Sequence, residues 1–259
     1  MRSRFATPVA IVLTLAVAGA GLNRLVSPAW TAMRARQPAL QLDSTAAAAG
    51  QGVTLALLGG FRALVADGVW LRLYALWERQ DLAATDAMIR LTTAIDARPV
   101  YFWLNGARIL ANDLPVWRIM MQGGFERVPQ PEQRRIMEEQ ARSGLAHLAA
   151  AMKFHPASSD LWIERANIEL NKLHDPLAAA ASYRRAWEMP NGPFYAARLH
   201  AELLRRNGRR AEALAWLVQL HPQLPRGDEA AAADIVLERI RELEQQLGVA
   251  PERVYQPKP

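Results

Sequence analysis

The class of fold is decided by the stretch PASSDLWIERANIELNKLHDPLAAAASYRRAWEMP, residues 156–190. Apolar residues recur in it at three- and four-residue spacing, which is the period of one face of an α-helix. It lacks the alternating pattern, rich in valine and isoleucine, that is typical of a β-strand. A proline stops a helix because it has no N–H and clashes with the preceding turn. We therefore expect helices that end at Pro190.

Prolines recur at a nearly constant interval around this stretch. Pro190 follows Pro156 by 34 residues, and Pro225 follows Pro190 by 35. Pro156 follows Pro99 by 57 residues, which is one such interval with 23 residues added. A fixed interval of this length is typical of a helical repeat protein, in which neighbouring units together bury a continuous core.

Within each interval, small residues stand where two paired helices would have to approach closely. They are Ala75, Ala87 and Ala94 before Pro99; Gly106, Gly144 and Ala151 before Pro156; Ala166, Ala179 and Ala186 before Pro190; and Ala201 and Ala213 before Pro225, with Gly208 in the break between the last two paired helices. In these residues the chain resembles the tetratricopeptide repeat family, over about residues 68–225. The resemblance implies an all-α fold, a right-handed α-solenoid of helix hairpins. We expect it to occupy residues 53–247, with a capping helix from about Asp228 to Leu247 and an unstructured tail at 248–259.

The second repeat unit departs from this pattern. Where the family has a short turn, the chain has LPVWRIMMQGGFERVPQP, residues 114–131, with three prolines and the pair Gly123-Gly124. We expect an irregular insertion that exposes Trp117 and Phe125.

The N-terminal segment predicts a link to a membrane. Residues 5–22, FATPVAIVLTLAVAGAGL, carry no charge and follow Arg2 and Arg4. As a helix they would span roughly 27 Å, about the hydrocarbon core of a bilayer. They form either a transmembrane anchor or a cleavable signal peptide. With residues 1–4 as a cytoplasmic tail and 23–52 as a linker, we expect a single-pass protein of the bacterial inner membrane whose repeat domain faces the periplasm.

Composition and motifs argue against several classes of function. The chain has no cysteine, which excludes disulfides and thiolate catalysis. The net charge of +6 rests on arginine, since only three of the 31 basic residues are lysines, and no aromatic-plus-basic pattern accompanies it. Metal-ligand spacings, a phosphate-binding glycine loop and a nucleophile elbow are also missing from the sequence. We expect no nucleic-acid partner, no metal, no cofactor and no enzyme activity.

After these exclusions, the function that remains is the binding of a protein or peptide partner. In tetratricopeptide arrays the first helix of each hairpin lines a concave groove, so the resemblance implies a partner-binding groove in this chain. Carried over by register, its residues are Arg72, Arg79, Trp103, Asn167, Asn171, Tyr195, Arg198, Arg205 and Arg206. Arginine forks and carboxamides suit an acidic peptide or a C-terminal carboxylate. The same residues could equally be ordinary charged, solvated helix faces.

The sequence thus predicts a membrane-anchored protein–protein interaction scaffold of the bacterial cell envelope. One alternative is an envelope enzyme or enzyme accessory whose pocket is completed by residues 114–131. Another is an adaptor that rests Trp117, Met120, Met121 and Phe125 on a lipid surface.

Overall fold

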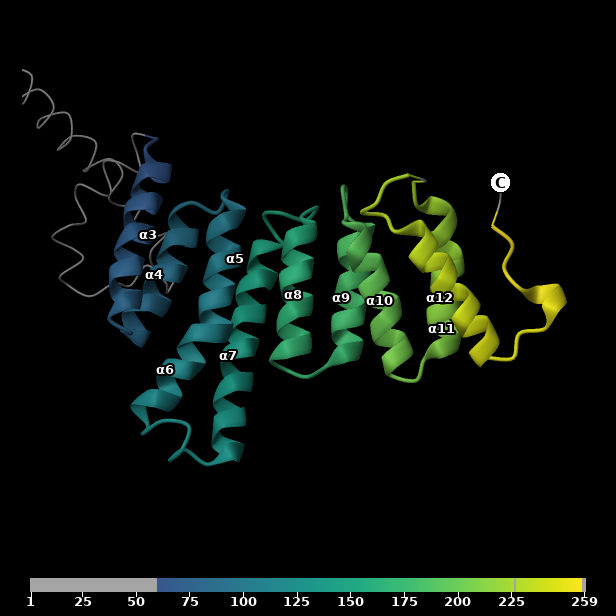
Figure 1. Ribbon diagram of the computed structural model, residues 1–259. Coiled ribbons are helices and arrows are strands. Elements are labelled where there is room, and N and C mark those ends of the chain that lie inside the picture. Colours follow the sequence, from purple (N-terminus) through teal and green to yellow (C-terminus); the bar gives the residue numbers. More distant parts are fainter. Residues whose placement is uncertain (1–59, 226, 258–259) are drawn as a thin grey trace, which may run out of the picture. The chain divides into compact units, whose positions relative to one another are not determined.

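The computed structural model describes residues 60–225 and 227–257, and these residues are helical with no β-strand among them (Figure 1). The predicted all-α class is confirmed. The chain divides into two compact units, Met1–Asp96 and Ala97–Pro259. The segments predicted at 1–4, 5–22 and 23–52 lie outside the described residues. Among the helices that are described, none is both long and apolar enough to cross a bilayer.

The first unit contains a helix hairpin, α3 (Arg62–Glu78) and α4 (Leu82–Ile95). The Asp81 carboxylate accepts a hydrogen bond from the Ala84 N–H at 3.1 Å and so caps the start of α4. Helix α3 buries Ala66, Trp70 and Leu73, which follow each other at helical spacing.

The register predicted for this first unit is wrong. Ala75 and Ala94 are exposed rather than packed at the helix contact, and Ala87 is only partly buried. Ala75 lies two positions after the buried Leu73, which places it on nearly the opposite side of α3.

The second unit contains the remaining helices, which follow one another along the chain and pack side by side in sequence order (Figure 1). They are α5 (Val100–Arg108), the π-helix η2 (Ile109–Asp113), α6 (Leu114–Met121), α7 (Gln130–Ala151), α8 (Ser159–Asn171), α9 (Pro176–Glu188), α10 (Phe194–Arg206), α11 (Arg210–Leu220), the 3-10 turn η3 (His221–Gln223), α12 (Ala233–Gln246) and the 3-10 turn η4 (Pro251–Arg253).

In this unit most of the small residues lie where the pattern predicts contact. Gly144 of α7 is the tightest case: a Cβ added there would stand 3.1 Å from the Ala107 carbonyl oxygen and 3.2 Å from the Ala111 Cβ. The other small residues that are buried are Gly106, Ala151, Ala166, Ala179, Ala186, Ala201 and Ala213. Gly208 is exposed and, at φ +78°, makes the left-handed turn between α10 and α11, where the pattern predicts the break between the paired helices.

The extra residues of the second repeat lengthen one helix hairpin. From Val100 to Met121 the chain is helical without a break, because η2 joins α5 to α6, and α7 runs for 22 residues. Figure 1 shows α6 and the first half of α7 reaching past the ends of the helices that follow. A π-helical segment of this kind accommodates additional residues within an α-helix. The insertion is therefore mostly helical, with an irregular part only between Met121 and Gln130.

The tip of this long hairpin has its own small core. Ile119, Val128 and Ile136 are buried together, and the Gln133 side-chain amide donates to the carbonyl oxygens of Phe125 and Val128, both at 2.8 Å. This holds the connecting loop against α7.

The expected exposure of Trp117 and Phe125 holds only for the second of them. Phe125 is 44% exposed, whereas Trp117 is 7% exposed. Trp117 follows the buried Leu114 by three residues, so both side chains point to the same, inner face of α6.

The C-terminal tail also differs from the prediction. It includes η4, and Tyr255 packs edge-on against the His221 ring with 5.5 Å between ring centroids. The Tyr255 hydroxyl and His221 Nδ1 are 3.0 Å apart, and the Tyr255 N–H donates to the Glu244 carboxylate. An aromatic residue in the tail finds a partly buried position beside the core of α11 and α12.

Candidate functional site

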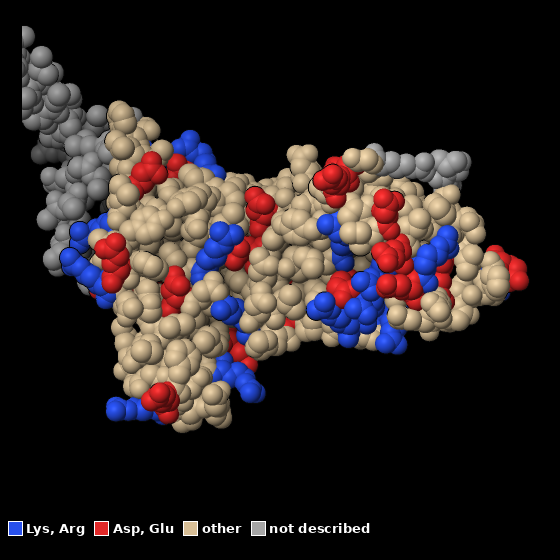
Figure 2. All heavy atoms as spheres, in the orientation of Figure 1, with Lys and Arg blue, Asp and Glu red and all other residues tan. Residues whose placement is uncertain are grey.

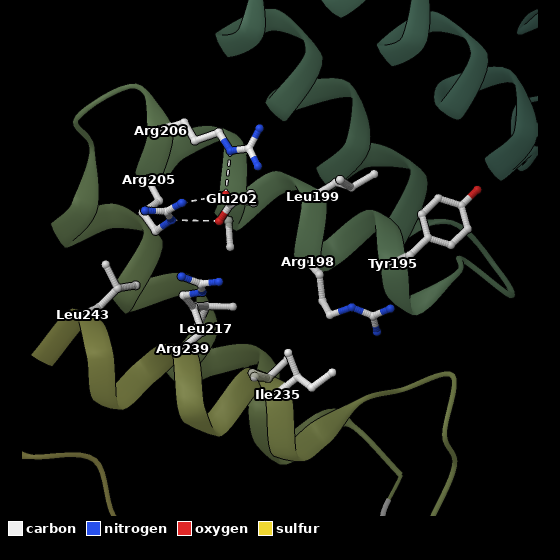
Figure 3. Close-up of a pocket in the computed structure, with 12 residues that line it drawn as sticks. Tyr195, Arg198, Leu199, Glu202, Arg205, Arg206, Leu217, Ile235, Arg239 and Leu243 are labelled. Carbon is white, nitrogen blue, oxygen red and sulfur yellow. Dashed lines mark hydrogen bonds and ion pairs between the residues drawn. The ribbon is translucent and has the colours of Figure 1, made fainter.

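A cavity of the second unit lies between α10 and α12, and α11 contributes to its floor (Figure 3). Its volume is about 450 Å³. The apolar lining residues are Leu199, Ala201, Leu217, Ile235, Val236 and Leu243, and the polar ones are Tyr195, Arg198, Glu202, Arg205, Arg206 and Arg239. We call this cavity the α10–α12 pocket.

Helix α10 presents its polar residues to the pocket because its other face is the apolar one. Its buried side chains include Ala197 and Leu204, which join the core with α11 and α12. Tyr195, Arg198, Glu202 and Arg205 are separated by three, four and three residues. They therefore form one stripe along the helix.

One carboxylate serves two arginines on this stripe. Arg205 donates to Glu202 from Nε at 2.8 Å and from Nη2 at 2.7 Å, and Arg206 Nε donates to Glu202 at 2.6 Å (Figure 3). The hydrogen bonds from Arg205, before those from Arg206, lower the pKa of Glu202 to about 2, against the opposing effect of burial. Because two guanidiniums share one negative charge, the cluster keeps an excess positive charge.

Arg198 is held by neutral partners instead. Its Nη1 donates to the carbonyl oxygens of Ala230 at 2.8 Å and Ala231 at 2.9 Å. These bonds tie α10 to the segment that leads into α12, where Ala232 takes the left-handed conformation with φ 50°. No carboxylate among the described residues pairs with Arg198, so its charge adds to the excess.

On the opposite wall, Arg239 of α12 pairs with Glu242 at 2.7 Å. Basic and acidic side chains accordingly alternate over the surface of α10–α12, which lies at the right of Figure 2. In the pocket lining, Ile235 is 60% exposed although Val236, the next residue, is buried. The pocket combines an apolar floor with a rim of net positive charge, and it can take a ligand that joins an aliphatic group to a carboxylate.

Of the groove residues predicted from the sequence, Tyr195, Arg198, Arg205 and Arg206 line this pocket. Arg72 lies on α3 and Arg79 directly follows it; both are exposed, and both belong to the first unit. Asn167 and Asn171 lie on α8 outside the pocket. The Asn167 side-chain oxygen accepts a hydrogen bond from the Tyr183 hydroxyl at 2.7 Å, and Asn171 is exposed.

Trp103 is a core residue, which corrects its assignment to a groove. It is 5% exposed, and its indole N–H donates to the Ala97 carbonyl oxygen at 2.9 Å. Its ring is stacked on Phe154 at 5.8 Å and lies 4.7 Å from the His147 ring. As an aromatic residue near the start of a helix it packs inward between α5 and α7.

None of the groove residues predicted from the sequence lies on α12, which forms the opposite wall of the α10–α12 pocket. Ile235, Arg239 and Leu243 follow one another at four-residue spacing, which the sequence shows, but that spacing equally fits a helix that merely caps the array. The 60% exposure of Ile235 is what separates the two interpretations, and it is known only from the structure.

The described residues do not bring together three or more His, Asp or Glu side chains in a way that could hold a metal ion. Buried carboxylates have structural partners: Glu164 accepts from Arg108 Nε at 2.8 Å, and Glu169 accepts from the Ser182 hydroxyl at 2.6 Å. These bonds connect α5 with α8 and α8 with α9.

Comparison of the chain with protein-family models, with curated proteins and with solved structures finds no match.

Proposed function

We propose that this chain is a membrane-anchored scaffold of the bacterial cell envelope that binds a partner protein through the α10–α12 pocket. In this proposal residues 5–22 hold the chain in the inner membrane and its hairpins form a right-handed, tetratricopeptide-like α-solenoid in the periplasm. The bound element is a peptide segment of the partner that carries an aliphatic side chain beside a carboxylate, either an acidic side chain or the chain's C-terminus.

The observation that carries the proposal is the composition of the pocket. A guanidinium binds a carboxylate through two parallel N–H donors, and it does so most strongly beside apolar surface that excludes water. Arg206 is 69% exposed and shares Glu202 with Arg205, so it has donors left for a ligand. Covering the exposed part of Ile235 would contribute about 1 kcal/mol of hydrophobic stabilisation.

Peptide binding tests this proposal. Fluorescence anisotropy with the full chain in a non-ionic detergent would compare short peptides ending in leucine or isoleucine, with a free or an amidated C-terminus. We expect the free carboxylate to bind about tenfold more tightly or better, because the charge-assisted bonds are lost on amidation.

The variant Arg206→Glu should abolish this preference. Arg210→Glu is the matched control, because Arg210 is exposed on α11 but does not line the pocket. Equal affinity for the two peptide forms would count against a carboxylate-binding pocket.

An enzyme or enzyme accessory remains the alternative. Its pocket, completed by residues 114–131, would need an acid–base pair within hydrogen-bond reach. A smaller pocket next to the long hairpin includes Gln130 of that segment and His174, but its lining has no carboxylate. The geometry therefore favours binding over catalysis.

A further inference from the structure

The first turns of α7 and the α8–α9 turn enclose a second pocket, of about 260 Å³. In Figure 1 both segments lie at the same end of the α7–α9 group. The pocket is lined by Gln130, Gln133, Arg134, Met137, Lys172 and His174. Two of these side chains are cationic, a third is a histidine, and none is acidic. One of only three lysines in the chain is among them.

The basic side chains of this pocket are not neutralised within the part of the chain that the structure describes. The side chains of Arg134, Lys172 and His174 have no hydrogen-bond or ion-pair partner there. The neighbouring Arg135 differs sharply, since it pairs with Glu132 at 2.6 Å and with Glu139 at 3.5 Å. Positive charge therefore accumulates at the pocket although acidic residues are available on the same helix.

The acidic residue next to His174 in the sequence is already used elsewhere. Asp175 follows His174 directly, and its carboxylate accepts from the Ala178 N–H at 2.9 Å as the cap of α9. It does not line the pocket.

Backbone hydrogen bonds hold the turn that carries Lys172 and His174. The Lys172 N–H donates to the Ile168 carbonyl oxygen at 3.0 Å, and the Asp175 N–H donates to the Glu169 carbonyl oxygen at 2.9 Å. Between them His174 has φ 52°, a left-handed conformation that is uncommon for residues with a side chain. On the other side of the pocket, Gln133 is held by its two bonds to the loop of the long hairpin.

We propose that this pocket binds a phosphate group. A phosphate offers several acceptor oxygens in a tetrahedral arrangement, which suits a guanidinium fork, an ammonium and an imidazole N–H that come from two separate segments. Its charge of up to two also matches two cations better than a single carboxylate does. The positive end of the 22-residue helix α7 adds to the attraction at Gln130. The phosphate belongs either to a small soluble ion or ester, or to the headgroup of an anionic lipid.

Titration of the full chain with inorganic phosphate, in a non-ionic detergent and followed by calorimetry, tests the site. We expect saturable binding that weakens about tenfold in Arg134→Gln and in Lys172→Gln, each of which removes one charge-assisted contact. Arg135→Gln is the matched control and should bind within about twofold of the unaltered chain, since its guanidinium is engaged by carboxylates. Thermal melts of the three variants check that each one folds.

Two further ligands distinguish a soluble phosphate from the phosphate of a lipid headgroup. Glycerol 1-phosphate carries the phosphate without acyl chains. A short-chain phosphatidic acid, used below its micelle concentration, carries the same phosphate with acyl chains. Tighter binding of the lipid by about tenfold identifies a headgroup, and equal binding identifies a soluble phosphate. The proposal is overturned if phosphate does not bind at millimolar concentration, or if Arg135→Gln weakens binding as much as Arg134→Gln does.

Discussion

Arg205 donates two hydrogen bonds, of 2.8 and 2.7 Å, to the carboxylate of Glu202, which lies three residues before it on α10. With Arg206 on the same carboxylate, this arrangement controls both the charge of the α10–α12 pocket and part of the stability of its wall.

The first prediction concerns pH. The pKa of Glu202 is lowered to about 2 in the folded chain, below its ordinary value of 4.5. The folded state therefore binds the proton less readily than the unfolded state. The resulting stabilisation is complete above about pH 5 and is lost as the pH falls through 4.5 towards 2.

The measurement is chemical denaturation of the unaltered chain and of Glu202→Gln at several pH values. We expect Glu202→Gln to be less stable by about 1 to 2 kcal/mol at pH 6, after allowance for solvent screening, and the gap to close near pH 2. A gap that stays constant from pH 6 to pH 2 would show that the ion pairs do not stabilise the fold.

The second prediction concerns the close contact at Gly144. Gly144→Ala should lower the free energy of unfolding by about 1 to 3 kcal/mol, because its Cβ would meet the Ala107 carbonyl oxygen at 3.1 Å. Gly68→Ala in α3 is the control: nothing lies within 4 Å of the added Cβ, and an exposed helix position gains about 0.5 to 1 kcal/mol from alanine. If both substitutions stabilise the chain, α5 and α7 are not in close contact at Gly144.

The third prediction concerns the tip of the long hairpin. Met120, Met121 and Phe125 are exposed by 56%, 65% and 44%, close together in the sequence. Because the chain has no cysteine, Phe125→Cys can carry a single environment-sensitive fluorophore. If the tip rests on lipid, its emission should shift to the blue when the full chain moves from detergent into vesicles.

Gln219→Cys on the exposed side of α11 provides the reference, and its label should not shift. A similar spectrum for both labels in vesicles would argue against contact between the tip and the membrane.

The sequence predicts the helical class and much of the hairpin register because both depend on local features. In the second unit the small residues at 144, 166 and 179 stand where paired helices come into close contact, and they are buried as expected. In the first unit the same spacing is a coincidence, since alanine is so abundant that Ala75 and Ala94 match the pattern while Trp70 and Leu73 form the core.

The polar stripe of α10 was predictable for a similar reason. Tyr195, Arg198 and Arg205 follow one helix face, which the register gives directly. Its opposite wall depends on how α12 packs on α11 and so faces α10, a long-range arrangement that no local pattern in residues 233–246 specifies. Similarly, the length of the insertion was evident, but the π-helix that joins α5 to α6 was not.

The central claim is tested most directly by crosslinking at Ile235, which is exposed in the pocket and can be replaced by a cysteine that carries a photoactivatable group. In membranes from cells that make this variant, we expect one discrete protein adduct. It should disappear when Arg206→Glu is added and persist with Arg210→Glu. An adduct that is unaffected by Arg206→Glu, or that forms equally from Gln219→Cys, would contradict a partner-binding pocket between α10 and α12.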